Sequence, residues 1–527
     1  MEVMHLSQPV SSVVLFWNKL LLLCLGLLIT AACADRTEQA TQHAAQADLH
    51  LQAGELWLAR QSIGDAIAER DDLPELHLLH GRIEAASEAY GTAFAAYSNA
   101  LALDSKNMEA LQAVSQLGLR TGDLRESLDA TERILVLQPS QESALLVRGI
   151  HAFARNRYGD AIEDADRVIA LRPGSEEASI LKSRALFMMG DAAEALEVIE
   201  AVQGGTADSE GVARTKLELS RETGSPQGMQ AQFNRLRQLR PDDADLRIDE
   251  ANLRFKLGEI QAGTKLLTDL LTREDLRQMS ASQAIDLLRD YSAAIPEGAV
   301  PDLAASASQT TLVELARYFL ENERAGASDL VIRQLPASEA QPLEARLALL
   351  RNQPSQALKT AKEVLSRDET QCDALLALSE ASLANRDVPS ATRSAQRAAA
   401  ECPNRSEAWL ATAAAYQARD EPIGVQRVYR DAIKANPQSF STAKAYADWL
   451  AREGRQREAL AIVRSFTRSS PALLRGWAYY RSLCTRLNGG CENDAQRGLA
   501  EARTRYGIDT RTGELPQTGL FGRLARR

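Results

Sequence analysis

The side chains with the most chemical potential in this sequence are its six cysteines. Four of them lie in the body of the chain, at Cys372, Cys402, Cys484 and Cys491. An even number of cysteines in an oxidising compartment predicts two disulfides, whereas a cytosolic chain would keep the same four as reduced, buried side chains. Because none of them forms a Cys-x-x-Cys pair, a zinc site is not expected. The choice between these two states depends on whether the chain is exported.

An apolar segment near the N-terminus predicts export. Lys19 precedes residues 20–32, a run of 13 residues, whereas roughly 20 residues are needed to cross a bilayer. The length instead fits the core of a signal peptide. The sequence Thr-Ala-Ala-Cys at 30–33 resembles a bacterial lipobox, which implies that Cys33 becomes a lipidated first residue, although Thr30 stands where that motif usually has leucine.

Two alternatives stay open for this segment. Cleavage after Ala34, at Ala-Cys-Ala, would release a free periplasmic protein, and an uncleaved segment would act as an anchor. All three outcomes place the body of the chain outside the cytoplasm. Ala34 also differs from the aspartate that retains lipoproteins at the inner membrane, so the resemblance implies the outer membrane.

The histidines are the other candidates for a metal or catalytic site. His77 and His80 are three residues apart on one predicted helix, and His43 and His50 lie on the helix before it. Most of these positions pack between helices, so we expect packing rather than metal binding, and His151 has no obvious partner. The sequence contains no phosphate-binding loop and no Gly-x-Ser-x-Gly turn. It therefore predicts no catalytic residue, no cofactor and no metal.

Composition points to a helical, acidic protein. The chain has 527 residues with 61 basic and 71 acidic side chains, a net charge of -10. An acidic chain without a basic stripe argues against nucleic-acid binding. Aromatic residues make up only 5%, and the abundant Ala, Leu, Arg and Glu lose little rotamer freedom in helices.

The elements that position these side chains follow a period of 34 residues. Pro139 and Pro173 are 34 apart, and Pro403, Pro437 and Pro471 keep the same interval. Each proline follows an amphipathic helix, which it ends because it cannot continue the backbone hydrogen bonding. The interval predicts a repeated pair of helices.

Within each 34-residue frame, small residues occupy fixed positions. The frame 108–141 has Ser115 at position 8, Gly122 at position 15 and Ser127 at position 20. Small residues let two antiparallel helices approach closely, and the turn near position 15 needs a residue that tolerates positive φ. One such hairpin cannot bury its apolar face alone, so neighbouring hairpins must stack.

This frame resembles the tetratricopeptide repeat (TPR) family over about residues 40–275 and 338–507. The resemblance implies an all-α, TPR-type solenoid, an α-superhelix of about 11–13 hairpins including degenerate ones. Residues 278–337 lack the frame, and we expect degenerate hairpins there, with a hinge between two domains as the alternative. The expected organisation is a signal peptide and lipobox at 1–33, TPR blocks at 40–277 and 338–473, the connector 278–337, a capping hairpin at 474–507 and a disordered tail at 508–527.

The 34-residue frame also predicts how the cysteines pair. Cys372 lies at position 1 and Cys402 at position 31 of one repeat, which antiparallel helices bring to the same edge of the hairpin. A Cα separation of about 5.5 Å, which a disulfide needs, is plausible there. Cys484 and Cys491 flank the turn of the capping hairpin. We predict disulfides 372–402 and 484–491.

A partner groove is expected on the concave side, which TPR proteins line with positions 2, 5, 9, 12 and 13. In the first block this line is apolar, which predicts a binding groove, unless the superhelix is tight and these side chains pack on each other. The groove residues would be Leu146, Ile150, Phe153, Ile180, Arg184, Phe187, Met188, Ile248 and Phe255. The second block has a polar line, which fits polar partners or simple solvation; it includes Asp373, Glu380, Glu407, Lys444, Asp448 and Arg452.

The anchor and the repeats together resemble TPR lipoproteins of secretion and pilus assembly, and those of exopolysaccharide export. That resemblance implies a non-catalytic scaffold that binds protein partners of an envelope assembly or export complex, held on the periplasmic side of the membrane by its lipid. The alternative is a periplasmic, chaperone-like binder of polypeptides that uses the apolar groove. A TPR clamp for chaperone C-termini is not expected, because Asn252 at position 9 is accompanied by Ile248 rather than lysine at position 5.

Overall fold

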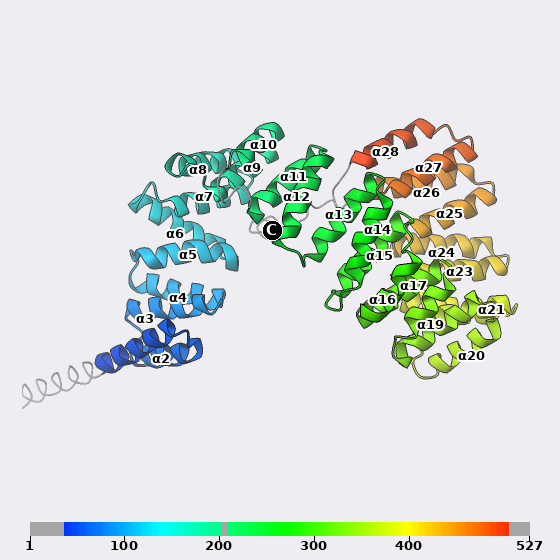
Figure 1. Cartoon of the computed structure of the whole chain (residues 1–527), viewed down its shortest axis with the longest axis horizontal. Coiled ribbons are helices and arrows are strands. Elements are labelled where there is room, and N and C mark those ends of the chain that lie inside the picture. The colour runs from blue at the N-terminus through cyan, green and yellow to red at the C-terminus, as the bar shows by residue number, and fades with distance from the viewer. Residues whose placement is uncertain (1–35, 203–208, 505–527) are drawn as a thin grey trace, which may run out of the picture. The chain divides into compact units, whose positions relative to one another are not determined.

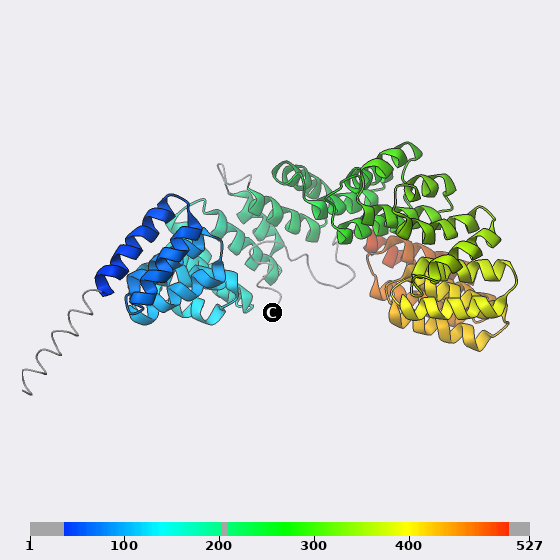
Figure 2. The same ribbon diagram turned by 90° about the horizontal axis from the view of Figure 1, so that it is seen from below.

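The computed structural model describes residues 36–202 and 209–504, and every regular element in these ranges is a helix. The proposed lipidation site Cys33, the cleavage site at Ala34 and the tail 508–527 lie outside the described residues. The described chain forms two compact units, which divide at residues 207 and 208. The predicted all-α helical repeat is therefore confirmed (Figures 1 and 2).

Unit 1 comprises five helical hairpins between residues 36 and 202. Its first helix covers residues 36–52. The helices that follow are α2 (Leu56–Glu69), α3 (Pro74–Ala86), α4 (Tyr90–Leu103), α5 (Met108–Thr121), α6 (Leu124–Leu137), α7 (Glu142–Ala154), α8 (Tyr158–Leu171), α9 (Glu176–Met189) and α10 (Ala192–Glu200).

Unit 2 comprises nine hairpins between residues 209 and 504. The first of them are built by α11 (Glu210–Glu222), α12 (Pro226–Leu239), α13 (Ala244–Lys256), α14 (Ile260–Leu271), α15 (Gln278–Asp290), the short η2 (Glu297–Ala299), α16 (Val300–Ser306), α17 (Gln309–Glu321) and α18 (Ala325–Ile332). The rest are built by α19 (Ala337–Leu350), α20 (Pro354–Leu365), α21 (Cys372–Ala384), α22 (Val388–Glu401), α23 (Ser406–Ala418), α24 (Pro422–Ala435), α25 (Phe440–Arg452), α26 (Gln456–Ser469), α27 (Leu474–Arg486) and α28 (Glu492–Thr504).

The turn inside each hairpin contains a left-handed residue at position 15 of the repeat, as the sequence predicted. These positions recur every 34 residues, and more than half of them carry a side chain instead of glycine. Positive φ occurs at Gly54, Glu88, Gly122, Asn156, Gly190, Gly224, Gly258 and Ser292, and again at Asn352, Arg386, Asp420, Gly454 and Asn488. The period is therefore a property of the turn geometry, which glycine makes easy but does not solely determine.

The period breaks only between Ser292 and Asn352. The one left-handed turn between them is at Glu323, which is out of phase with both neighbours. Two helix pairs, α15 with the seven-residue α16 and α17 with α18, nevertheless fill the segment 278–337. With these irregular pairs included, the described total is fourteen, above the 11–13 that the sequence predicted.

Helix starts recur with the same period. Side chains at several repeat junctions accept a hydrogen bond from the backbone N–H three residues on, which satisfies one of the free donors of the first turn. The capping residues at 34-residue intervals are Asn107, Gln141, Ser175, Ser209 and Asp243. Cap and turn together fix where each hairpin begins and bends.

Close helix packing explains the small residue at position 8. A Cβ atom on Gly81 in α3 would lie only 2.7 Å from the ring of Tyr97 in α4, so the ring occupies the space that a side chain would need. Tyr97 is itself buried. The pairing of a small residue with a large one lets the two helices of this hairpin touch.

The superhelix of unit 2 closes on itself. Lys256 at the end of α13 donates to the backbone oxygen of Ala502 in α28 at 2.9 Å. Arg475 in α27 pairs with Asp290 of α15 at 2.6 Å and donates to the backbone oxygen of Arg289 at 2.9 Å. Figures 1 and 2 show the C-terminal helices in red and orange beside the green helices near α13. The last hairpin is thus docked against the second and third.

Candidate functional site

Charged side chains on the inner side of unit 2 meet at Asp373. The carboxylate of Asp373 is 1% exposed and pairs with Arg317 of α17 at 2.8 Å and with Arg346 of α19 at 3.1 Å. Arg405, which precedes α23, approaches it at 2.9 Å. Hairpins that are not neighbours in sequence meet here, which places these side chains on the shorter, concave side of the array. We call Asp373 and its three arginines the ion cluster.

The ion cluster holds Asp373 ionised. Burial opposes the charge, but the guanidinium groups of Arg405, Arg317 and Arg346 outweigh it and keep the pKa of Asp373 well below its usual range. Arg405 also approaches Glu407 at 3.4 Å. The cluster therefore ties α17, α19, α21 and the start of α23 together.

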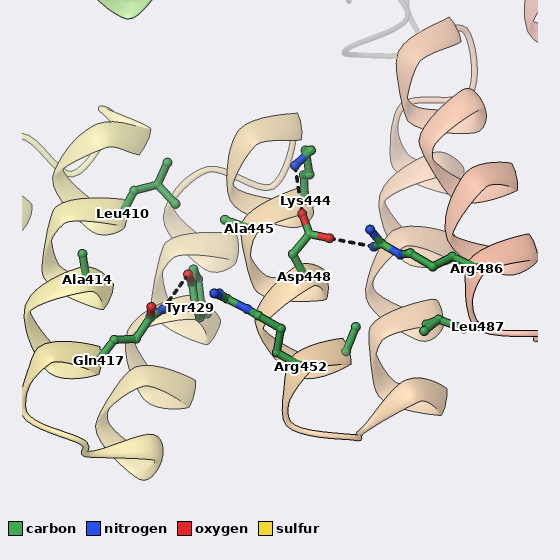
Figure 3. A pocket seen from close by; sticks show the side chains of 11 residues that line it. Leu410, Ala414, Gln417, Tyr429, Lys444, Ala445, Asp448, Arg452, Arg486 and Leu487 are labelled. Atoms are coloured by element: carbon green, nitrogen blue, oxygen red, sulfur yellow. Dashed lines mark hydrogen bonds and ion pairs between the residues drawn. The ribbon is translucent and has the colours of Figure 1, made fainter.

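An open pocket of about 770 Å³ lies further along the same inner side (Figure 3). Its walls come mainly from the first helices of three successive hairpins, α23, α25 and α27, with Tyr429 from α24. We call this the polar pocket; it is lined by Leu410, Ala414, Gln417, Tyr429, Lys444, Ala445, Asp448, Ala451, Arg452, Arg486 and Leu487.

Asp448 organises one side of the polar pocket. Its carboxylate accepts from Lys444 at 2.8 Å, from Arg486 at 2.8 Å and from the hydroxyl of Tyr479 at 2.7 Å. Burial would raise the pKa of Asp448, but these three donors hold it below the usual range. Asp448 is therefore an anion that fixes two cations in place along the pocket wall.

Arg452 occupies the opposite side of the polar pocket. Its side chain is exposed and, as Figure 3 shows, its guanidinium lies near Tyr429, whose hydroxyl accepts from Gln417 at 3.3 Å. No hydrogen bond or ion pair engages this guanidinium anywhere in the described ranges. The pocket thus presents three cations against one carboxylate, in a chain whose net charge is -10.

A second pocket of about 640 Å³ adjoins the first and shares Arg486 with it. It lies between α27 and α28 and also contains Arg481 and Glu492. The two pockets make a strip along the last three hairpins, and Arg486 stands between them.

The predicted apolar groove is largely closed. Ile150, Ile180, Ile248 and Phe255 are buried, so the prediction that they form an open groove floor is wrong. They pack into neighbouring hairpins because an apolar side chain on a concave face gains more from contact than from water.

The other predicted groove residues are partly accessible. Leu146, Phe153, Arg184 and Phe187 are half-buried, and Met188 is 45% exposed. Ile248 and Phe255 also belong to unit 2, whereas the rest belong to unit 1.

Two histidines, His77 and His151, are buried inside the hairpins, whereas His43, His50 and His80 are half-buried. His77 bonds to the backbone oxygen of Asp71 at 2.7 Å, and His151 bonds to the hydroxyl of Ser127 at 2.9 Å. Burial, aided by nearby Arg155, lowers the pKa of His151 to about 4. In residues 36–202 and 209–504, no group of three His, Cys, Asp or Glu side chains could hold a metal ion.

The four body cysteines lie in the two predicted hairpins. Cys372 and Cys402 are disulfide-bonded with Cα atoms 6.3 Å apart, and Cys484 and Cys491 with Cα atoms 5.6 Å apart. The pairing in the native protein stays a prediction, which mass analysis under non-reducing conditions tests. Four alkylatable thiols among these residues would contradict it.

Sequence reasoning placed Lys444, Asp448 and Arg452 on the concave line but missed most of the polar pocket. Leu410, Ala414 and Gln417 are at positions 5, 9 and 12 of the repeat 406–439, and Arg486 is at position 13 of the capping hairpin. The same register therefore could have found them, if it had been applied to every hairpin. Tyr429 could not have been found this way, because it comes from a second helix.

Two models of the tetratricopeptide repeat match the sequence, over residues 115–176 and 152–216. TPR units are therefore present in α5–α11. No curated protein matches the sequence. None of the helices in the described ranges has the length and apolar content needed to cross a membrane.

Several solved structures match this chain in a structural comparison. A thermophilic TPR protein of Thermus thermophilus is 20% identical, with 34% of this chain and 100% of that chain covered and a TM-score of 0.30. PilW, a type IV pilus biogenesis factor, is 17% identical, with coverage of 38% and 94% and a TM-score of 0.33. Yeast Tom70 is 12% identical, with coverage of 82% and 100% and a TM-score of 0.33. Similarities of this size bear on no partner or pathway of this chain.

Proposed function

We propose that this chain is a non-catalytic, TPR-type scaffold that binds a protein partner through the polar pocket of unit 2. The observation that supports this most is the side chain of Arg452, which is exposed, faces an open pocket and has no partner among the described residues. Repeat arrays present extended concave surfaces of this kind to partners.

The lining of the polar pocket favours an acidic polypeptide. Lys444, Arg452 and Arg486 supply positive charge, while Leu410 and Leu487 supply apolar contacts between them. Complementary charge would select an acidic segment and exclude a basic one. A chaperone-like function would need an open apolar groove instead, and most of that predicted groove is buried or half-buried.

The proposed place of this scaffold is the periplasmic side of the cell envelope, with Cys33 lipidated and inserted in the outer membrane. The apolar run 20–32 and the Thr-Ala-Ala-Cys sequence support this, as does the presence of paired cysteines in the body. There the scaffold would organise an assembly or export complex, of the exopolysaccharide-export or pilus type.

The pocket is tested with a fluorescein-labelled hexaglutamate peptide and the full-length chain. We expect Arg452→Glu to weaken binding by about tenfold or more, since a charge-assisted contact is worth roughly 1.5–3 kcal/mol. Arg430→Glu is the matched control, because Arg430 is an exposed arginine on α24 outside the pocket. Equal binding by the native chain and both variants would refute the pocket.

The anchor is tested separately in bacteria. Cys33→Ser should abolish palmitate labelling and globomycin-sensitive processing, while the native chain shows both. A native chain that takes up no palmitate would refute the lipid. Crosslinked capture from membranes, compared between the native chain and Arg452→Glu, then identifies the partner and its complex.

A further inference from the structure

We infer that the disulfide Cys484–Cys491 positions one wall of the polar pocket, so that the partner site is complete only in the oxidised chain. This inference rests on the proposed function, because it concerns the same pocket. It adds a means of control: the chain would acquire its binding site after export to an oxidising compartment.

The two cysteines enclose the residues that form the wall. Cys484 lies in the last turn of α27, and Cys491 immediately precedes α28. Between them lie Arg486 and Leu487, which both line the polar pocket. Arg486 also separates that pocket from its neighbour. The disulfide therefore closes a short loop whose first residues belong to the binding site.

Three backbone hydrogen bonds shape the loop together with the disulfide: Leu487 donates to Leu483, Asn488 to Thr485 and Gly489 to Cys484. Asn488 and Gly490 are both in the left-handed region, and two consecutive glycines, Gly489 and Gly490, favour many other conformations in a free chain. A Cβ atom on Gly489 would lie 2.5 Å from Leu460 and 3.3 Å from the sulfur of Cys491. The loop is thus packed directly against the disulfide.

The rest of the last hairpin is held at its other end. Arg475 at the start of α27 is bound to α15, and Ala502 near the end of α28 is bound to Lys256. Both contacts are at the open edge of the hairpin, whereas the pocket residues are at the turn. The disulfide is the covalent link at the turn edge, where Arg486 reaches out to Asp448.

Loss of this bond would change the pocket through Arg486. Its guanidinium donates to Asp448 at 2.8 Å, and Asp448 in turn holds Lys444. A loop that samples other conformations would withdraw one cation and loosen the second. The other disulfide, Cys372–Cys402, lies at the ion cluster and contributes no residue to the pocket, which makes it a matched control.

The experiment uses the full-length chain with Cys24→Ser, Cys33→Ser, Cys372→Ala and Cys402→Ala, in which Cys484 and Cys491 are the remaining cysteines. Binding of fluorescein-labelled hexaglutamate and amide hydrogen exchange are measured before and after reduction by a phosphine, with helicity followed by circular dichroism. We expect binding to weaken by about tenfold, the loss of one charge-assisted contact, with faster exchange at residues 485–490 and unchanged helicity. Unchanged exchange and unchanged binding after complete reduction would overturn the inference.

A second variant gives the reverse comparison. Cys484→Ala with Cys491→Ala keeps the other disulfide, and we expect it to bind the peptide weakly with or without the phosphine. If this variant does not fold, the reduction experiment on the folded chain still tests the inference. If the oxidised chain fails to bind hexaglutamate at all, the acidic partner is refuted, whereas exchange at 485–490 and at 444–452 still tests the positioning. Exchange that stays the same there refutes it.

Discussion

The concave register of the repeats is buried in much of unit 1 but lines an open pocket in the last three hairpins of unit 2. In unit 1 it carries apolar side chains such as Ile150 and Ile180, and these are buried between hairpins. In unit 2 the same register carries Lys444, Asp448 and Arg452, and an open pocket lies in front of them. Apolar residues on a curved inner face close the space between repeats, whereas charged residues must keep their contact with water or with each other. A polar line therefore indicates an accessible surface only where its charges face water, because Asp373 of the same line is buried among three arginines.

The largest test of this contrast removes the charge at the centre of the ion cluster. Asp373→Asn leaves Arg317, Arg346 and Arg405 without their shared anion, and we expect a loss of about 3–5 kcal/mol in the stability of unit 2. Urea denaturation measures it. Glu363→Gln is the control, because that carboxylate belongs to an exposed pair with Lys359 at 4.0 Å. Equal losses of stability in the two variants would mean that the ion cluster stabilises unit 2 no more than an exposed ion pair does.

The apolar line of unit 1 is tested by Phe153→Asp combined with Phe187→Asp. Phe153 packs against Tyr158 with ring centroids 5.4 Å apart, so charges here should destabilise unit 1 by about 3 kcal/mol. Binding of hexaglutamate should stay unchanged, because the pocket is in unit 2. The double change to leucine is the control. A variant that keeps its stability but loses partner capture would show that the apolar line of unit 1 is a partner-binding groove after all.

Acidification should affect the stabilities of the two units differently. His151 is 2% exposed and is buried as a neutral ring with a pKa of about 4, so the unfolded chain binds a proton more readily than the folded one below pH 6.5. Unit 1 should lose about 2 kcal/mol between pH 7 and pH 5. The depressed pKa of Asp373 keeps its contribution to unit 2 over that range and releases it only in stronger acid. Urea denaturation at both pH values measures this loss of stability. In His151→Gln, we expect the stability of unit 1 to be the same at pH 7 and pH 5. If the variant still loses stability at pH 5, another group causes the pH dependence.

The smallest expected effect is that of Arg452→Ala on stability. An exposed guanidinium without a partner in the described chain contributes to binding alone, so the free energy of unfolding should change by less than about 0.5 kcal/mol. Thermal unfolding measures it. A drop of several degrees in Tm would show that Arg452 supports the fold and would weaken its assignment to a partner site.

The sequence was sufficient to predict the repeat but not the curvature of the array. The 34-residue period, the left-handed turn at position 15 and the close contact of Gly81 with Tyr97 all depend on local geometry, which residue types specify directly. Whether a concave residue is open or buried depends on small rotations that accumulate from hairpin to hairpin. Ile150 and Asp448 are both at position 9 of their repeats, and only the assembled unit distinguishes the buried residue from the pocket residue.

The missed features share this origin. The ion cluster joins Arg317 to Asp373 across 56 residues, and the polar pocket combines three hairpins. No periodic pattern encodes such contacts, because they depend on how tightly successive hairpins curve. Each cysteine pair lies within one hairpin, so the local register is enough to predict the pairing, which stays a prediction.

The contacts of Lys256 and Arg475 with the opposite end of unit 2 limit how this unit can evolve. An open solenoid can gain or lose a repeat by duplication or deletion, because each repeat touches only its neighbours. Here an inserted hairpin would rotate α27 and α28 away from α13 and α15 and break the ion pair of Arg475 with Asp290. The contacts between the two ends therefore fix the number of hairpins at nine. We expect relatives of this unit to vary in side chains and loops while they conserve the number of repeats.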